Sequence, residues 1–276
     1  MAVVLQAASR ESLAAANARL DAYVDSASAA DLQRLGAELF AVTRLLVAQR
    51  ALRRLLADPS SPEAARTGLA QRLLGQQVAQ PTLDIVNVLV ASRWSQPADL
   101  VAASEALARQ ATLAVAEKDQ SLDGVEDELF RFGRILDREP QLNGLLADTT
   151  APEERRVGLL DQVLGGKVSP VTATLLRQSV RLARSRHLDL VSEELAELAA
   201  ARRDRSVARI TAPVALTPEQ EQKLSDSLAR LYGRPISLQV ELDPSLLGGL
   251  VVQVGGEVID GSVAGKLAAA RRTLPT

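Results

Sequence analysis

A repeat with an offset of ninety residues constrains the fold of this chain more than any other feature. Residues 55–101 align without a gap with residues 145–191, and 18 of the 47 aligned positions are identical. The identities include aspartate, proline, glutamate and glycine, which mark caps and loops and are not explained by a chance match between Ala- and Leu-rich helices. We therefore predict an internal duplication of one structural unit.

Several matched pairs lie where helices are expected to begin or end. These pairs are Asp58 with Asp148, Pro62 with Pro152, Glu63 with Glu153, Gly75 with Gly165, and Asp99 with Asp189. A weaker match continues upstream through Glu38 and Phe40, which correspond to Glu128 and Phe130. Both copies should therefore divide into helices at the same places.

Apolar residues recur through the first copy at intervals of three and four, the spacing of one helix face. This spacing predicts helices over 9–27, 30–48, 50–57, 81–93 and 98–118. Another helix starts at Ser61-Pro62-Glu63, with proline as its first residue, and closes at Gly75. By the offset of ninety, residues 99–117 are also the first helix of the second copy, so the two copies share this helix or abut through it.

The periodicity changes from helical to alternating near residue 207. Alternation predicts strands over 207–214, 236–242, 250–254 and 257–259, the last two joined by a turn at Gly255-Gly256. Further helices are predicted over 217–232 and 263–272. A unit of this size is only marginally stable alone, so we expect it to dock onto another protein.

The predicted fold class is mainly α, with a small α+β domain at the C-terminus. Two tandem six-helix-type bundles, over residues 1–110 and 99–205, share or abut through a helix. The C-terminal domain covers residues 206–276 and contains a β-hairpin.

Composition excludes several classes of function. Hydrophobic residues make up 47% of the chain but aromatic residues only 2%, so leucine, valine, isoleucine and alanine must form the core. A net charge of -2 and so few aromatics disfavour nucleic acid binding. The chain has no cysteine and a single histidine, His187, which excludes thiol nucleophiles and multi-histidine metal sites. We expect no metal, no cofactor and no catalytic residue.

The remaining candidates for chemistry have structural interpretations. Adjacent acids such as Glu153 and Glu154 point in different directions on a helix and make a poor general acid–base pair. We interpret His187 as a surface or capping residue. Trp94 is interpreted as a packing residue, with partner binding as the alternative. No segment approaches the ~18 consecutive apolar residues of a membrane-spanning helix, and the first residues lack signal-peptide features. We expect a cytosolic protein or one peripheral to a membrane.

Residues 242–267 read LDPSLLGGLVVQVGGEVIDGSVAGKL. Gly248 and Gly249 suit a positive φ or a close backbone approach where the chain enters the hairpin. Asp260 can cap the final helix or turn the chain, and Gly261 and Ser262 supply the bend. The stretch holds no G-x-G-x-x-G or G-K-[ST] pattern, so these glycines do not form a phosphate-binding loop.

This stretch resembles the C-terminal signature of the delta subunit of bacterial F-type ATP synthases, whose mitochondrial equivalent is the oligomycin sensitivity-conferring protein. The family pattern is an acidic residue and a small turn, then L-x-G-G, a β-hairpin, and V-I-D-G-S before a basic helix. Every part is present here. A usual family member has one six-helix domain, so the duplication resembles the enlarged delta region of some actinobacterial synthases.

The resemblance implies a non-catalytic stator subunit without a cofactor. Such a subunit would link the alpha/beta catalytic head to the b-subunit peripheral stalk and resist rotor torque during proton-driven ATP synthesis. It would be peripheral, at the cytoplasmic face of the bacterial plasma membrane. One alternative is a generic helical-repeat adaptor of another complex, which accounts for residues 1–205 but not for the hairpin signature. An enzyme with a diffuse site is a second alternative.

The resemblance also implies two partners. The helical part would receive the N-terminal helix of an alpha subunit, with the candidate contacts Leu13, Ala16, Leu20, Ile85, Val88 and Leu89 on helices one and five of the first copy. The corresponding second-copy helices, 99–117 and 170–183, could hold another alpha subunit. The C-terminal domain would bind the end of the b subunit, with the candidate contacts Leu246, Leu247, Val251, Val252 and Ile259. Some of these apolar residues must instead belong to the core.

Overall fold

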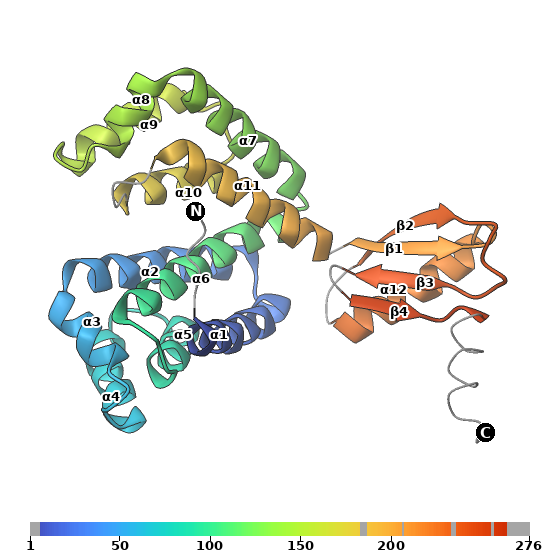
Figure 1. Cartoon of the computed structure of the whole chain (residues 1–276), viewed down its shortest axis with the longest axis horizontal. Helices are drawn as coiled ribbons and strands as arrows, with labels where there is room; N and C mark the ends of the chain where they lie inside the picture. The colour runs from blue at the N-terminus through green and yellow to red at the C-terminus, as the bar shows by residue number, and fades with distance from the viewer. Residues whose placement is uncertain (1–5, 183–186, 206, 233–235, 255–256, 264–276) are drawn as a thin grey trace. The chain divides into compact units, whose positions relative to one another are not determined.

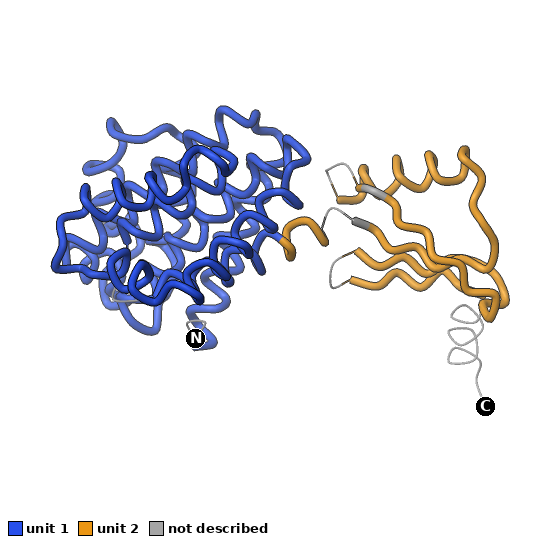
Figure 2. The backbone as a smooth tube through the Cα atoms, turned by 90° about the horizontal axis from the view of Figure 1, so that it is seen from above, with its two compact units in different colours: residues 1–199 blue, residues 200–276 orange. Residues whose placement is uncertain are grey.

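The computed structural model describes residues 6–182, 187–205, 207–232, 236–254 and 257–263. The chain divides into two compact units, residues 1–199 and residues 200–276 (Figure 2). The predicted Gly255-Gly256 turn lies outside the described residues, as does all but the first residue of the predicted helix over 263–272. Within the described part of the chain, no helix is both long and apolar enough to cross a membrane.

The first unit consists of helices (Figure 1), and several of them have the same bounds in both copies when ninety is subtracted. They are α1 (Ala7–Ser26), α2 (Ala29–Ala48), α3 (Arg50–Ala57), α4 (Glu63–Leu74), α5 (Gln80–Ala91), α6 (Pro97–Lys118), α7 (Leu122–Arg138), α8 (Pro140–Ala147), α9 (Glu153–Leu164), α10 (Pro170–Arg181) and α11 (Leu188–Arg205). Helices α4 and α9 differ by ninety at both ends, and so do α5 and α10. The last helix, α11, continues a few residues beyond the unit's boundary.

Helix α6 belongs to both copies, as the sequence predicted. It packs against α1, α2, α3 and α5 of the first copy and against α7 and α10 of the second. Residues all around α6 are therefore buried, among them Leu100, Leu107 and Leu113. A single apolar core runs through both copies, and leucine, valine and alanine supply most of it. Small alanines let the helices approach closely, which suits the low aromatic content.

Helices α2 and α6 pack together most extensively and lie side by side in Figure 1. A Cβ added to Gly36 of α2 would lie 2.6 Å from Thr112 Oγ1 of α6, so only glycine permits this approach. Thr43 Oγ1 and Ser104 Oγ form a hydrogen bond of 2.8 Å across the same contact. A buried hydroxyl pair of this kind leaves neither group unsatisfied, because each hydroxyl can donate and accept.

Two predicted helix boundaries need correction. Pro62 is the N-cap of α4 and not its first residue, with an extended ψ of 142°, so the helix begins at Glu63. Gly75 follows α4 in a right-handed conformation, φ −58°, and not in the left-handed one that usually selects glycine there. Its counterpart Gly165 does adopt the left-handed conformation, with φ 54°. The two copies thus end this helix differently although the glycine is common to both.

The second unit is a four-stranded sheet with one described helix. Its elements are β1 (Val207–Ala212), α12 (Pro218–Tyr232), β2 (Ser237–Leu242), β3 (Val251–Val254) and β4 (Glu257–Asp260). The strand order is β2-β1-β3-β4, with β1 and β2 parallel and the other pairs antiparallel. A parallel pair needs a crossover, and α12 provides it. Ala208, Ile210, Leu228, Val252 and Val254 form the centre of a separate core. The predicted mainly helical fold with a small C-terminal α+β domain is confirmed.

Candidate partner-binding surfaces

Helix α5 is held at its N-terminus by a glutamate from α2. Glu38 Oε2 accepts hydrogen bonds from the Ala79 amide, at 2.9 Å, and from Thr82 Oγ1, at 2.5 Å. Burial alone would raise the pKa of the Glu38 carboxyl, but the hydrogen bonds from Thr82, Arg34 and the Ala79 amide hold it below its usual range. A carboxylate at this end also favours the helix dipole.

The second copy repeats this arrangement at α10. Glu128 of α7 accepts hydrogen bonds from the Ser169 amide, at 3.0 Å, and from Thr172 Oγ1, at 2.5 Å. These residues stand ninety positions after Glu38, Ala79 and Thr82. The glutamate and the threonine are identical in both copies, and that identity was the sequence signal for a contact that periodicity does not reveal.

A buried arginine holds the other end of each helix. Arg66 donates from Nη1 to the Ser92 carbonyl, at 2.9 Å, and from Nη2 to the Ala91 carbonyl, at 3.0 Å. Arg156 in the second copy donates to the Val180 carbonyl at 2.7 Å. Helices α5 and α10 therefore have an anion at the N-terminus and a cation at the C-terminus, both favourable to the dipole. Each helix is fixed at both ends.

The structure places most of the candidate contacts for the alpha subunit inside the core. Ala16 and Leu20 of α1 and Ile85 and Leu89 of α5 are at most 1% exposed. Leu13 and Val88 are half-buried and pack against the core. The exposed residues of α1 include six alanines beside charged residues such as Arg10, Glu11 and Arg19. These alanines are Ala7, Ala8, Ala14, Ala15, Ala18 and Ala22.

Polar contacts hold α1 in place against its neighbours. Arg19 and Asp84 form a salt bridge of 2.9 Å between α1 and α5. Ser9 Oγ donates to Asp99 Oδ2 at 2.7 Å, which joins the starts of α1 and α6. Trp94 lies nearby, buried, with Nε1 donating to the Leu89 carbonyl at 2.7 Å, in agreement with its interpretation as a packing residue. Helices α1 and α5, which form this surface, are thus held in place by polar contacts.

His187 is exposed and lies immediately before α11. Its carbonyl accepts a hydrogen bond from the Val191 amide at 3.4 Å. This position agrees with the surface or capping interpretation of the residue.

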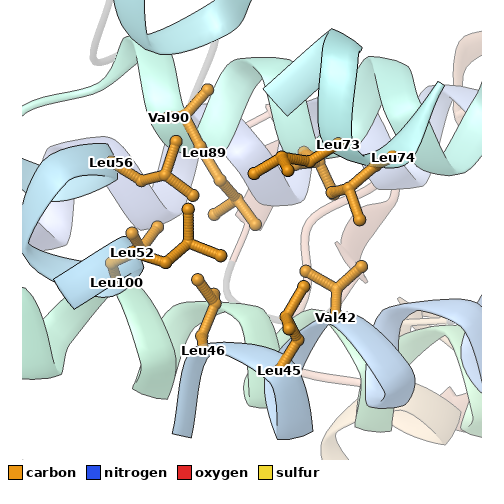
Figure 3. Close-up of a pocket in the computed structure, with 11 residues that line it drawn as sticks. Val42, Leu45, Leu46, Leu52, Leu56, Leu73, Leu74, Leu89, Val90 and Leu100 are labelled. Atoms are coloured by element: carbon orange, nitrogen blue, oxygen red, sulfur yellow. The ribbon is translucent and has the colours of Figure 1, made fainter. Parts of the chain in front are cut away.

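An apolar pocket lies between α2, α3, α4, α5 and α6 (Figure 3). Its lining consists of Val42, Leu45, Leu46, Leu52, Leu56, Leu73, Leu74, Val86, Leu89, Val90 and Leu100. Leu73 at its rim is exposed. A pocket with only leucine and valine side chains can hold apolar groups, but it offers no group that could transfer a proton or orient a substrate.

In the second unit the signature glycines let two antiparallel segments lie very close together. Gly248 and Gly249 have φ values of 142° and 82°, as the sequence predicted. A Cβ added to Gly249 would collide with the Gly261 carbonyl. Hydrogen bonds of 2.9 Å from the Gly261 amide to the Leu250 carbonyl and from the Val263 amide to the Gly248 carbonyl continue the pairing of β3 with β4 beyond the two strands.

Asp260 turns the chain at the end of β4. Its Oδ1 accepts a hydrogen bond from the Ser262 amide at 2.9 Å. Hydrogen bonds from the Ser262 side chain and amide lower the pKa of the Asp260 carboxyl. Ser262 is buried beneath this turn. All five signature residues therefore have a structural role in the paired segments before β3 and after β4.

The candidate contacts for the b subunit divide between core and surface. Val252 is buried in the sheet core, whereas Leu246 and Val251 are half-buried. Leu247 is 81% exposed and Ile259 is 37% exposed. Ile259 lies on β4, an edge strand on which every residue is exposed. Exposed apolar side chains at the open edge of a sheet are a common mark of protein contacts.

Comparison with protein families gives one match over most of the chain. The model of the family described as "ATP synthase delta (OSCP) subunit" matches residues 108–274. The match begins within α6, so it takes in helices α7 to α11 and the C-terminal unit. The first helical copy, up to α5, precedes it.

Relatives from several bacteria match almost the whole chain, the first copy included. "ATP synthase subunit delta" of Parafrankia sp. (strain EAN1pec) is 46% identical over 277 residues, which cover 98% of this chain and 99% of the relative. "ATP synthase subunit delta" of Streptomyces avermitilis is 48% identical over 267 residues, 97% of each chain. "ATP synthase subunit b-delta" of Mycobacterium sp. (strain KMS) is 43% identical over 98% of this chain and 61% of its own. This chain therefore belongs to the ATP synthase delta (OSCP) subunit family, in the enlarged form with a duplicated helical part.

Proposed function

We propose that this chain links the catalytic head of the synthase to the b-subunit peripheral stalk through two separate surfaces, one on each compact unit. Family membership makes the chain a structural, non-catalytic subunit of ATP synthase with a stator role. This finding also removes the generic helical-repeat adaptor and the enzyme with a diffuse site. The observation that carries the proposal is the division into two units, each with its own core and its own exposed apolar surface.

The helical unit is the proposed contact for the catalytic head, through the N-terminal helix of an alpha subunit. The surface between α1 and α5 supports this assignment, because α5 is fixed at both ends and a salt bridge ties it to α1. A rigid surface of small side chains can receive an amphipathic helix at low entropic cost. Since the larger apolar residues there are buried, the exposed alanines and Val88 would make the contact.

The C-terminal unit is the proposed contact for the end of the b subunit. Leu247 and Ile259 are exposed apolar residues, and Ile259 lies on the edge strand β4. The relative from Mycobacterium bears both names, b and delta, in one chain, and the part that matches here is 61% of it. A chain that combines the two parts supports their proximity in the complex. We further propose that the complex holds this chain at the cytoplasmic face of the membrane.

The test uses intact protein and two peptides, the N-terminal segment of the alpha subunit and the C-terminal segment of the b subunit from the same organism. We expect Leu247→Asp to weaken binding of the b peptide roughly tenfold or more, as loss of a central apolar contact does, and to leave the alpha peptide unaffected. Titration calorimetry measures both.

Leu231→Asp is the matched control, because Leu231 is an exposed leucine of α12 in the same unit. It should bind both peptides as the parent protein does. Loss of alpha-peptide binding by Leu247→Asp, or failure of the folded parent to bind either peptide, would contradict the proposal.

A further inference from the structure

Helix α2 of the first copy lies on a helix that also begins the second copy. Gly36 of α2 packs against Thr112 of α6, and Thr43 hydrogen-bonds to Ser104 of α6. A later residue of α2 thus meets an earlier residue of α6, so the two helices run antiparallel. Counted from the start of the second copy, Ser104, Ala108 and Thr112 are positions on its first helix.

The same α2 also reaches the fifth helix of the second copy. Arg44 Nη1 donates to Gln178 Oε1 of α10 at 2.7 Å. Burial and the nearby Arg181 lower the pKa of Arg44, which shows how closely its guanidinium approaches α10. Helices α6 and α10 are in contact with each other, so α2 packs on the first helix of the second copy and reaches the fifth helix through Arg44.

The first copy has the equivalent surface where α1 and α5 pack together. Subtracting ninety from Ser104, Ala108 and Thr112 gives Ala14, Ala18 and Ala22 of α1, and all three are exposed. Subtracting ninety from Gln178 gives Val88 of α5, which is half-buried. The positions that α2 covers in the second copy are therefore open in the first.

We infer that α2 covers the helix-binding surface of the second copy, formed by α6 and α10. The chain therefore accepts one partner helix of this kind, on the first copy, and not two. The partner would lie on Ala14, Ala18 and Ala22 as α2 lies on α6. The two hydroxyls that α2 meets, of Ser104 and Thr112, are replaced there by the methyl groups of Ala14 and Ala22. The exposed surface of α1 therefore suits an amphipathic helix whose contacting side chains are larger and apolar, because no hydroxyl group on α1 needs a hydrogen-bond partner there.

This inference rests on the proposed function for the identity of the partner, the N-terminal segment of the alpha subunit. Titration calorimetry of the intact chain with that peptide gives the stoichiometry. We expect one peptide per chain. Two equivalent peptides per chain would overturn the inference and leave the proposed function intact. Absence of binding by the folded protein would overturn both.

A pair of substitutions locates the site. Ala18→Glu places a carboxylate on the exposed face of α1 that the partner helix would cover. We expect this change to weaken peptide binding roughly tenfold or more. Ala41→Glu is the matched control, because Ala41 is an exposed alanine of α2, and it should bind the peptide as the parent does. Circular dichroism checks that both variants fold. Unchanged affinity in Ala18→Glu, or equal losses in both variants, would overturn the placement.

Discussion

At the scale of single residues, the signature of this family is a set of backbone requirements. Gly249 must be glycine for two reasons that act together, its φ of 82° and the proximity of the Gly261 carbonyl. Asp260 holds the neighbouring turn through a carboxylate that accepts the Ser262 amide. The close pairing of residues 248–250 with residues 261–263 fixes the chain next to Leu247, so residues without reactive groups still help to position an exposed apolar side chain.

Gly249→Ala should destabilise the second unit by about 1–3 kcal/mol, since alanine is strained at this φ and its Cβ meets a carbonyl oxygen. Hydrogen exchange of the β1 and β3 amides measures the loss. Gly68→Ala is the control, because a Cβ at Gly68 in α4 meets nothing within 4 Å. That variant should be neutral or up to about 1 kcal/mol more stable. If Gly249→Ala did not change stability, the backbone around residues 249 and 261 would be able to adjust to a Cβ without strain.

At the scale of elements, the duplication preserved the bracing of one helix. Each copy holds its fifth helix between a glutamate at one end and an arginine at the other. The four residues belong to pairs that are identical at the offset of ninety. The arginines Arg66 and Arg156 are buried, and a buried cation is retained only where carbonyls or anions compensate its desolvation.

The brace at Glu38 makes stability depend on pH. Its pKa is lowered in the folded protein, so the carboxylate contributes stability above the unfolded pKa of about 4.3, and this contribution is lost as pH falls through the lower folded value. Glu38→Gln should therefore be less stable than the parent at neutral pH, with the difference shrinking below about pH 4. Urea unfolding at a series of pH values measures this.

Glu197→Gln serves as the control for that experiment, because Glu197 is an exposed glutamate in the middle of α11, away from either helix end. It should follow the parent at every pH. A constant difference between Glu38→Gln and the parent from neutral to acidic pH would refute the role assigned to the carboxylate.

Much of the fold could be predicted from the sequence, because helix periodicity and cap residues are local properties. Ala16, Leu20, Ile85 and Leu89 were recognised as apolar face residues, but the same spacing serves a core and a partner-binding face. Only the packing of α1 on α5 and α6 shows that these residues face inward. In the second unit, Val252 and Leu247 are both apolar residues of one segment, but Val252 lies in β3 and faces the sheet core, whereas Leu247 lies before that strand and is exposed.

The packing of α2 on helices α6 and α10 of the second copy could not be predicted for a related reason. The sequence predicts that the two copies share α6 or abut through it, but it does not show which side of α6 each copy uses. Contacts such as Arg44 with Gln178 join residues 134 positions apart, and nothing local marks them. The duplication therefore reveals its consequence only in three dimensions, where one copy covers the surface that the other leaves open.

At the scale of the whole molecule, the shared helix predicts that the two copies unfold together. Leu107 is fully buried at the middle of α6, in a core that runs through both copies. Leu107→Ala should cost about 2–5 kcal/mol, and it should reduce amide protection in α4 and α9 alike, because neither copy can lose α6 and remain packed. Native-state hydrogen exchange resolved by peptide would show this.

Ile210→Ala is the matching change in the second unit, where Ile210 is fully buried in the separate core. It should reduce protection in β1 and β3 and leave α4 and α9 as protected as in the parent. If Leu107→Ala affected only one copy, the copies would be independent modules. A stator element made of such modules could flex at α6 under rotor torque. A common loss in both copies would instead mean that duplication extended the subunit without introducing a hinge, since any bending at α6 would have to disrupt one continuous core.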